Sequence, residues 1–88
     1  MKIYVVQGST GEYSDHREWL VKAFKSQEKA QDFVSFLDSK LLELGLKYES
    51  VYTHEDMEKE EKMMEFDPQF QFDYTGTMYS ILEVELEE

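Results

Sequence analysis

Two segments near the start of the chain have the apolar pattern of β-strands. Residues 2–7 and residues 17–24 are rich in β-branched and aromatic side chains. The stretch between them, residues 8–15, contains two glycines and several small polar residues, which is typical of a turn. The pattern predicts a β-hairpin whose connecting loop is longer than a tight turn.

The next segment has the clearest pattern in the chain, that of an amphipathic helix. Ser26 is in the position of an N-cap, and Glu28 follows in the first turn, where the helix dipole favours a negative charge. Gly45 is in the position where helices end in a left-handed residue. A stripe of apolar residues with helical spacing runs between the two ends: Ala30, Phe33, Val34, Leu37, Leu41 and Leu44.

The second half of the chain predicts a short acidic helix and a final strand. Thr53 is a candidate cap, with Asp56 three residues later in a variant of the capping box. Asp67 ends the helix, because the proline that follows it disfavours helical backbone. Residues 78–86 then alternate with period two. Two ion pairs at i,i+4 spacing support the helix: Glu55–Lys59 and Glu58–Lys62.

These elements together predict an α+β fold. Their order indicates a three-stranded, mostly antiparallel sheet, with one long amphipathic helix on one face and a short acidic second helix before the last strand. We expect residues 1–88 to form a single domain, in which residues 46–76 are an insertion-like acidic and aromatic segment.

The first strand is apolar on both faces, so both faces of the sheet need a cover. Ile3 and Val5 lie on one face, and Tyr4 and Val6 lie on the other. One helix covers only one face, and residues 48–74, a second copy of the chain or a partner could cover the other. We expect residues 48–74, because they are rich in Met and aromatic side chains. An exposed docking surface is the alternative use of these side chains.

Three short stretches form a combination that carries a family resemblance. They are residues 2–5 (Lys-Ile-Tyr-Val), residues 24–33 (Phe-Lys-Ser-Gln-Glu-Lys-Ala-Gln-Asp-Phe) and the Ile-Leu-Glu-Val-Glu-Leu ending at residues 81–86. The combination resembles a group of small bacterial and phage proteins with β-β-α-β order and no assigned function. The resemblance implies the fold described above and leaves the function open, and residues 46–76 depart from the shorter members.

The composition is that of a globular protein in a reducing compartment. Hydrophobic residues make up 41% of the 88 residues and charged residues 33%, which is too apolar for a disordered chain. There is no cysteine, so disulfides and thiolate chemistry are excluded. No stretch has the pattern of a signal peptide or a membrane span. We therefore expect a cytoplasmic protein that does not contact membranes and needs no cofactor.

The net charge of −11 lies entirely in the second half of the chain. Residues 1–48 hold seven basic and seven acidic side chains, whereas residues 49–88 hold two basic and thirteen acidic ones. Phosphate groups repel such a surface, so direct binding to nucleic acid or to anionic lipid is not expected. A protein partner with a basic surface is compatible with it.

The leading hypothesis is a small accessory protein, encoded by a phage or another mobile element, that binds a cellular protein and inhibits or modulates it. The candidate contacts are Glu55, Asp56, Glu58, Glu60, Glu61, Glu65 and Asp67, with Tyr74 and Tyr79 as aromatic anchors. A sharper form is nucleic-acid mimicry toward a nucleic-acid-handling target, such as a defence protein. The helix alone carries one net charge per about 4 Å, against one per about 1.7 Å of duplex DNA. Mimicry therefore needs further acids on a neighbouring surface: Asp73, Glu83, Glu85, Glu87 and Glu88. The alternative is a solvated, charged surface without a partner.

Two other classes of function stay open. The loop from Gly8 to His16 combines glycines, hydroxyl groups and an imidazole, so it could bind a small ligand or serve an enzyme. It lacks the Lys-[Ser/Thr] of a phosphate-binding loop and any nucleophile-elbow pattern, so we assign no catalytic residue. The two histidines lie in unrelated elements, and we expect no metal site. The second class is a homodimer formed through the uncovered face of the sheet.

Overall fold

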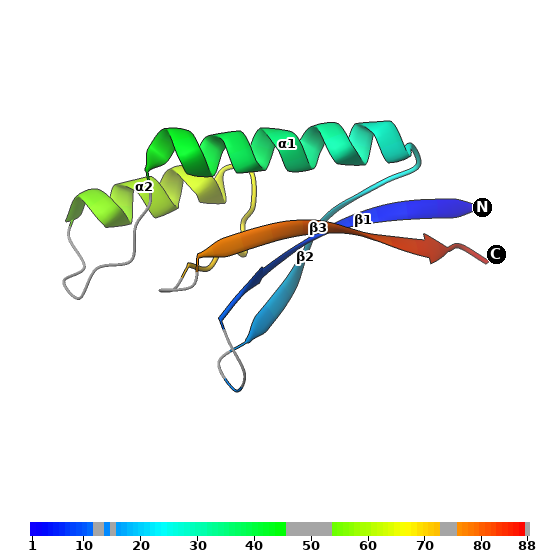
Figure 1. Cartoon of the computed structure of the whole chain (residues 1–88), viewed down its shortest axis with the longest axis horizontal. Helices are drawn as coiled ribbons and strands as arrows, with labels where there is room; N and C mark the ends of the chain where they lie inside the picture. Colours follow the sequence, from blue (N-terminus) through cyan, green and yellow to red (C-terminus); the bar gives the residue numbers. More distant parts are fainter. Residues whose placement is uncertain (12–13, 15, 46–53, 73–75, 88) are drawn as a thin grey trace.

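The described residues of this chain form three strands and two helices. The computed structural model describes residues 1–11, 14, 16–45, 54–72 and 76–87. The elements follow in this order: β1 (Lys2–Thr10), β2 (Arg17–Phe24), α1 (Gln27–Leu44), α2 (His54–Met64) and β3 (Thr77–Glu85). The strands form one antiparallel sheet in the order β2-β1-β3, and both helices lie on the same side of it (Figure 1). The predicted α+β fold is confirmed.

The long helix α1 begins and ends where the sequence predicts. Ser26 has extended backbone, and its Oγ accepts a hydrogen bond from the backbone N–H of Lys29 at 3.3 Å. Gly45 ends the helix in the left-handed conformation, with a φ of 63°. The apolar stripe packs on the sheet and buries Ala30 and Leu37 completely. For α2, the predicted cap Thr53 lies outside the described residues.

Gly8 belongs to a strand, although the sequence places it in a turn. It pairs with Trp19 of β2 on one side and with Tyr79 of β3 on the other. A Cβ atom at this position would lie 2.4 Å from Cε2 of the indole of Trp19. The missing side chain therefore lets the indole lie directly on the central strand. The hairpin loop begins only after Thr10.

A β-bulge in β2 decides which of its side chains face the helices. The register against β1 shifts between Val6 and Gln7, which leaves Val21 as an extra residue in β2. Strict alternation would put Trp19 and Phe24 on opposite faces of the sheet. Because of the bulge, both lie on the helix side, where they contact the second half of the chain and the core.

All of the core described in the structure lies between the sheet and the helices. It consists of Val6, Ala30, Leu37, Met63, Phe70 and Tyr79, with further half-buried apolar residues around them. Met63 and Phe70 belong to residues 48–74, so this segment extends the helix layer and covers the sheet next to α1. The prediction that it covers the second face is therefore wrong for the residues that are described. The turn after α2 instead reaches the helix side of the sheet, where Asp67 accepts a hydrogen bond from the indole of Trp19.

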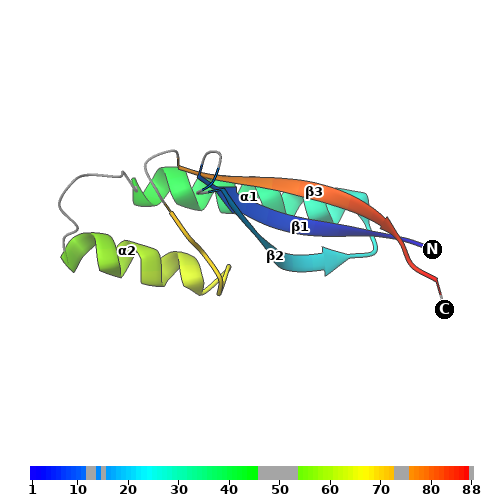
Figure 2. The same cartoon turned by 90° about the horizontal axis from the view of Figure 1, so that it is seen from below.

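The second face of the sheet has no cover from the described part of the chain. Figure 2 views the molecule from this side and shows the strands in front of α1, with α2 beside the sheet. The strand residues on this side, such as Val5 and Leu82, are not part of the core.

Candidate functional site

The outer side of α2 is the most strongly charged surface that the described residues form on a single element. Met63 is the fully buried residue of the helix. Half-buried residues precede it at helical spacing: Asp56, Lys59 and Glu60. Glu58 and Glu61 are exposed three residues apart on the side of α2 away from Met63, and the exposed Glu65 follows directly after the helix ends at Met64. We call these three residues the acidic stripe.

Two of the candidate acids in α2 lie beside basic side chains and stay accessible. Glu55 Oε1 lies 3.5 Å from Lys59 Nζ, as predicted. Glu58 Oε1 lies 3.3 Å from His54 Nε2. The side chains of Glu55 and Glu58 are 78% and 62% exposed, so each pair contributes no more than about 0.5 kcal/mol. Both carboxylates remain available to a partner.

Two exposed methionines lie beside the acidic stripe. Met57 is 40% exposed and Met64 is 42% exposed, and their separation of seven residues puts them on the same side of the helix. A methionine side chain is flexible and polarisable, so it adapts to an apolar surface of irregular shape. The outer side of α2 therefore offers negative charge together with adaptable apolar area.

Asp67 lies in the core of the protein and is fully buried. Its Oδ1 and Oδ2 accept hydrogen bonds from the indole N–H of Trp19 at 3.0 and 2.8 Å, and Oδ2 accepts a third from the hydroxyl of Tyr79 at 2.8 Å. Burial raises the pKa of Tyr79, and so does its bond to Asp67, because ionisation would put a second anion beside the carboxylate.

The burial of this cluster corrects two of the predicted contact residues. Asp67 has no exposed surface and Tyr79 is only 8% exposed, so the prediction that they touch a partner is wrong. Their polar atoms are used inside the protein, where they satisfy one another. Tyr74, the other predicted anchor, lies outside the described residues.

The acidic residues of β3 lie apart from those of α2. Glu83 is 3.6 Å from Lys2 Nζ, and Glu85 is 3.0 Å from the amino group of Met1. This end of β3 and α2 lie at opposite ends of the long axis of the molecule (Figure 1). The described residues therefore do not form the continuous acidic surface that nucleic-acid mimicry requires. Asp73 and Glu88 lie outside them.

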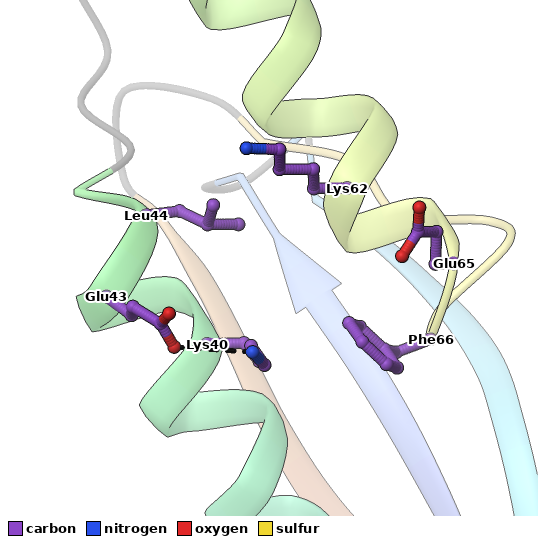
Figure 3. Close-up of a pocket in the computed structure, with 6 residues that line it drawn as sticks. All are labelled: Lys40, Glu43, Leu44, Lys62, Glu65 and Phe66. Carbon is purple, nitrogen blue, oxygen red and sulfur yellow. Dashed lines mark hydrogen bonds and ion pairs between the residues drawn. The ribbon is translucent and has the colours of Figure 1, made fainter.

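A shallow groove of about 300 Å³ separates the C-terminal end of α1 from α2 (Figure 3). It is lined by Lys40, Glu43, Leu44, Lys62, Glu65 and Phe66. Lys40 Nζ lies 3.3 Å from Glu43 Oε2 and 5.7 Å from the centre of the Phe66 ring. The two lysines balance the two glutamates, so the groove offers no excess charge to a small ionic ligand. We therefore interpret the groove as the space left where α1 packs beside α2, and not as a ligand site.

The hairpin loop does not form a catalytic arrangement in its described part. His16 is exposed, and its Nε2 lies 2.9 Å from Glu18 Oε1, while its Nδ1 lies 3.3 Å from the carbonyl oxygen of Gly11. These hydrogen bonds raise the pKa of the His16 imidazole, and the bond to Glu18 has the larger effect. Both described hydrogen-bond partners of the ring nitrogens are therefore groups other than a serine hydroxyl. Thr10, which the sequence placed in the loop, lies in β1 and donates its hydroxyl to the carbonyl of Gly76 at 2.6 Å.

The chemistry of the described side chains adds no further site. Among residues 1–11, 14, 16–45, 54–72 and 76–87, no three His, Asp or Glu side chains are placed to hold a metal ion. None of the described helices combines the length and the apolar character needed to span a membrane. Comparison of the chain with protein-family models, curated proteins and solved structures found no match. The resemblance to small bacterial and phage proteins stays a prediction.

Proposed function

We propose that this protein is a small accessory module that binds a cellular protein with a basic surface and thereby inhibits or modulates it. The binding surface is the outer side of α2, formed by the acidic stripe together with Met57 and Met64. The observation that carries the proposal is that Glu58, Glu61, Met57 and Met64 are exposed on one helix, with Glu65 exposed directly after it. The buried Met63 anchors the opposite side of this helix. A cytoplasmic role and an origin in a phage or mobile element are parts of the same proposal, supported by the lack of cysteine and by the family resemblance.

In this proposal the charged and the apolar side chains have different physical roles in binding. The carboxylates of the acidic stripe attract a basic surface from a distance and orient the encounter. Met57 and Met64 can then lose their contact with water against apolar atoms of the partner. Lys62, which belongs to the same helix, lines the groove toward α1 together with Glu65 (Figure 3).

Affinity capture followed by a direct binding measurement tests this proposal. The tagged chain is incubated with lysate of the source cell or its host, and the protein retained in stoichiometric amount is purified. Its dissociation constant is then measured with the wild-type chain and with Glu61→Lys. We expect a loss of affinity of roughly tenfold or more for this variant, because it reverses a charge in the middle of the stripe. Salt should also weaken the complex, because ions screen the attraction.

A matched variant separates a local effect from the effect of net charge. Asp32→Lys makes the same charge change on an exposed position of α1, away from the acidic stripe. We expect its affinity to stay within about twofold of the wild type. A captured partner whose binding is indifferent to salt, and equally weakened by both variants, would rule out the outer side of α2 as the binding surface.

A further inference from the structure

The face of the sheet opposite the helices forms an apolar surface that nothing in the described chain covers. Besides Ala23, the register of the strands places six larger apolar side chains on it: Ile3, Val5, Leu20, Met78, Leu82 and Val84. We call these residues the open face. None of them belongs to the core on the helix side. Figure 2 shows the molecule from this direction.

The outer strands expose the largest part of the open face. The side chains of Leu20, Met78 and Leu82 are 63%, 71% and 46% exposed. In the register of the sheet, Leu82 lies opposite the half-buried Val5, Leu20 lies opposite Gln7, and Met78 lies opposite Ser9. The pair Gln7 and Ser80 lies between Leu82 and Met78 on this face. Apolar side chains exposed together on one face of a folded protein mark a binding surface.

The open face carries almost no charge, although the chain has a net charge of −11. Its polar residues are mostly neutral, and Gln7 Nε2 donates a hydrogen bond to Ser80 Oγ at 3.3 Å. Within the three strands, all of which are described, Glu18 is the one charged residue that the register puts on this face. Glu83 and Glu85 fall on the helix side, opposite Tyr4 and Lys2.

We infer that two copies of this chain associate through the open face, with sheet stacked on sheet around a twofold axis. A twofold axis brings a surface against itself, and an uncharged apolar surface is complementary to its own copy. Side chains from two stacked sheets interdigitate across about 10 Å, as they do inside β-sandwiches. A basic partner, by contrast, would gain no electrostatic attraction from this face.

Stacking in this orientation also keeps the acidic parts of the two copies apart. The helix layers lie on the outside of the dimer, separated by two helix-to-sheet distances and one sheet-to-sheet distance, roughly 30 Å in total. The Debye length is about 8 Å at physiological ionic strength, so most of the repulsion between the two α2 surfaces is screened. Each dimer would display two copies of the outer side of α2.

The size of the open face sets the expected affinity. Strands of nine, eight and nine residues span an area of about 30 by 14 Å, roughly 400 Å² in projection per copy. Protruding side chains raise the total accessible area buried by two copies to about 1,000 Å², at the lower limit of specific interfaces. We therefore expect a reversible dimer with a dissociation constant on the order of 10 to 100 µM.

Sedimentation equilibrium of the full chain between about 5 µM and about 1 mM tests this inference, because the range brackets the expected dissociation constant. The wild type should shift from monomer to dimer. Leu82→Lys puts a charge on the open face and should weaken the dimer by more than about tenfold. Leu42→Lys is the matched control, because Leu42 is 85% exposed but lies on α1, and its dimer should form as in the wild type. Circular dichroism establishes that each variant is folded, and the milder Met78→Thr replaces Leu82→Lys if that variant is not.

The results that overturn the inference are a wild type that is monomeric at about 1 mM, or equal weakening by Leu42→Lys and by the open-face variants. A monomer would leave the open face to a different protein. Salt separates this inference from the proposed function: higher salt should leave the dimer unchanged or tighten it, because it screens repulsion, whereas it should weaken the complex made by α2. Either one can therefore fail without the other.

Discussion

The two faces of the sheet are built from alternate residues of the same three strands, yet they have different roles. On the helix side, the sheet packs against α1, and the buried carboxylate of Asp67, in the turn after α2, accepts hydrogen bonds from Trp19 of β2 and Tyr79 of β3. Among the described residues, no buried side-chain polar atom on this side or elsewhere lacks a partner. On the open face, the apolar side chains of Leu20, Met78 and Leu82 remain exposed.

This difference teaches how a chain of 88 residues divides its apolar side chains between folding and association. A short chain buries a smaller share of its surface than a long one. Two helices suffice to cover one face of this sheet. The second face, which none of the described residues covers, is then available for contacts with another molecule.

The largest expected effect contrasts a leucine that packs on the helix side with a leucine of the open face. Leu37→Ala should lower the free energy of unfolding by about 3 kcal/mol, because the side chain is fully buried in the core. Leu20→Ala should change it by less than about 0.5 kcal/mol in the monomer, because Leu20 is 63% exposed. Urea denaturation at low protein concentration measures both, and equal losses would contradict the assignment of the two faces.

The next effect contrasts two neighbours in β1 that lie on opposite faces. Gly8→Ala should lower the free energy of unfolding by about 2 kcal/mol, because the new Cβ would force the Trp19 indole off the strand and away from Asp67. Ser9→Ala, on the open face, should lie within about 0.5 kcal/mol of the wild type. Denaturation curves followed by tryptophan fluorescence measure both, and a neutral Gly8→Ala would show that the indole has room to move.

A smaller effect is expected from the hydroxyl of Tyr79. Tyr79→Phe should lower the free energy of unfolding by about 1 to 2 kcal/mol, because Asp67 loses one of its donors. The pKa of Tyr79 is raised in the folded protein, so the tyrosine of the unfolded chain ionises at a lower pH than that of the folded chain. The stabilisation by the Tyr79 hydroxyl is therefore fully present below pH of about 10 and is progressively lost above it. The difference between wild type and variant should therefore shrink in alkaline solution.

Ser80→Ala is the control for Tyr79→Phe, because Ser80 is the next residue in β3 and lies on the open face. Its exposed hydroxyl accepts from Gln7, and its loss should change the free energy of unfolding by less than about 0.5 kcal/mol. Equal losses of unfolding free energy for the two variants would mean that the buried Tyr79–Asp67 hydrogen bond stabilises the protein no more than the exposed Gln7–Ser80 bond does.

The smallest effect concerns His16, at the loop end of the open face. Its pKa is raised above the ordinary value of 6.5 by its hydrogen bonds to Glu18 and Gly11. A raised pKa means that the protonated imidazole favours the folded state in acid, and that this contribution is lost as the pH rises through the pKa. Glu18→Gln should lower the pKa of His16 in an NMR titration, and Glu28→Gln on α1 should leave it unchanged. A pKa that Glu18→Gln does not lower would contradict this pairing.

The sequence predicted the elements whose formation depends on near neighbours. The cap at Ser26 and the end at Gly45 follow from hydrogen bonds within four residues, and both are confirmed. The exposure of Glu58 and Glu61 also follows from helical spacing alone. The alternation of β3 follows from the period of a strand, and its predicted place is confirmed to within one residue.

The predictions that failed concern residues whose partners lie far along the chain. Asp67 looks like a surface acid before a proline, but Trp19 and Tyr79 lie 48 and 12 residues away from it. Gly8 has the sequence context of a turn residue, because the neighbouring residues give no sign that the Trp19 indole packs against it. The bulge at Val21 is likewise a property of the pairing between strands and changes the face of every residue beyond it.

The sequence by itself therefore determined the identity and order of the strands and helices, the ends of α1 and the concentration of negative charge in the second half. These properties depend on spacing, capping and composition, which act within a few residues. Only the tertiary structure decided that residues 54–72 join α1 on one side of the sheet, that Asp67 is buried and that no described residue covers the other face. Those outcomes depend on which distant surfaces fit together, and a local pattern carries no information about that choice.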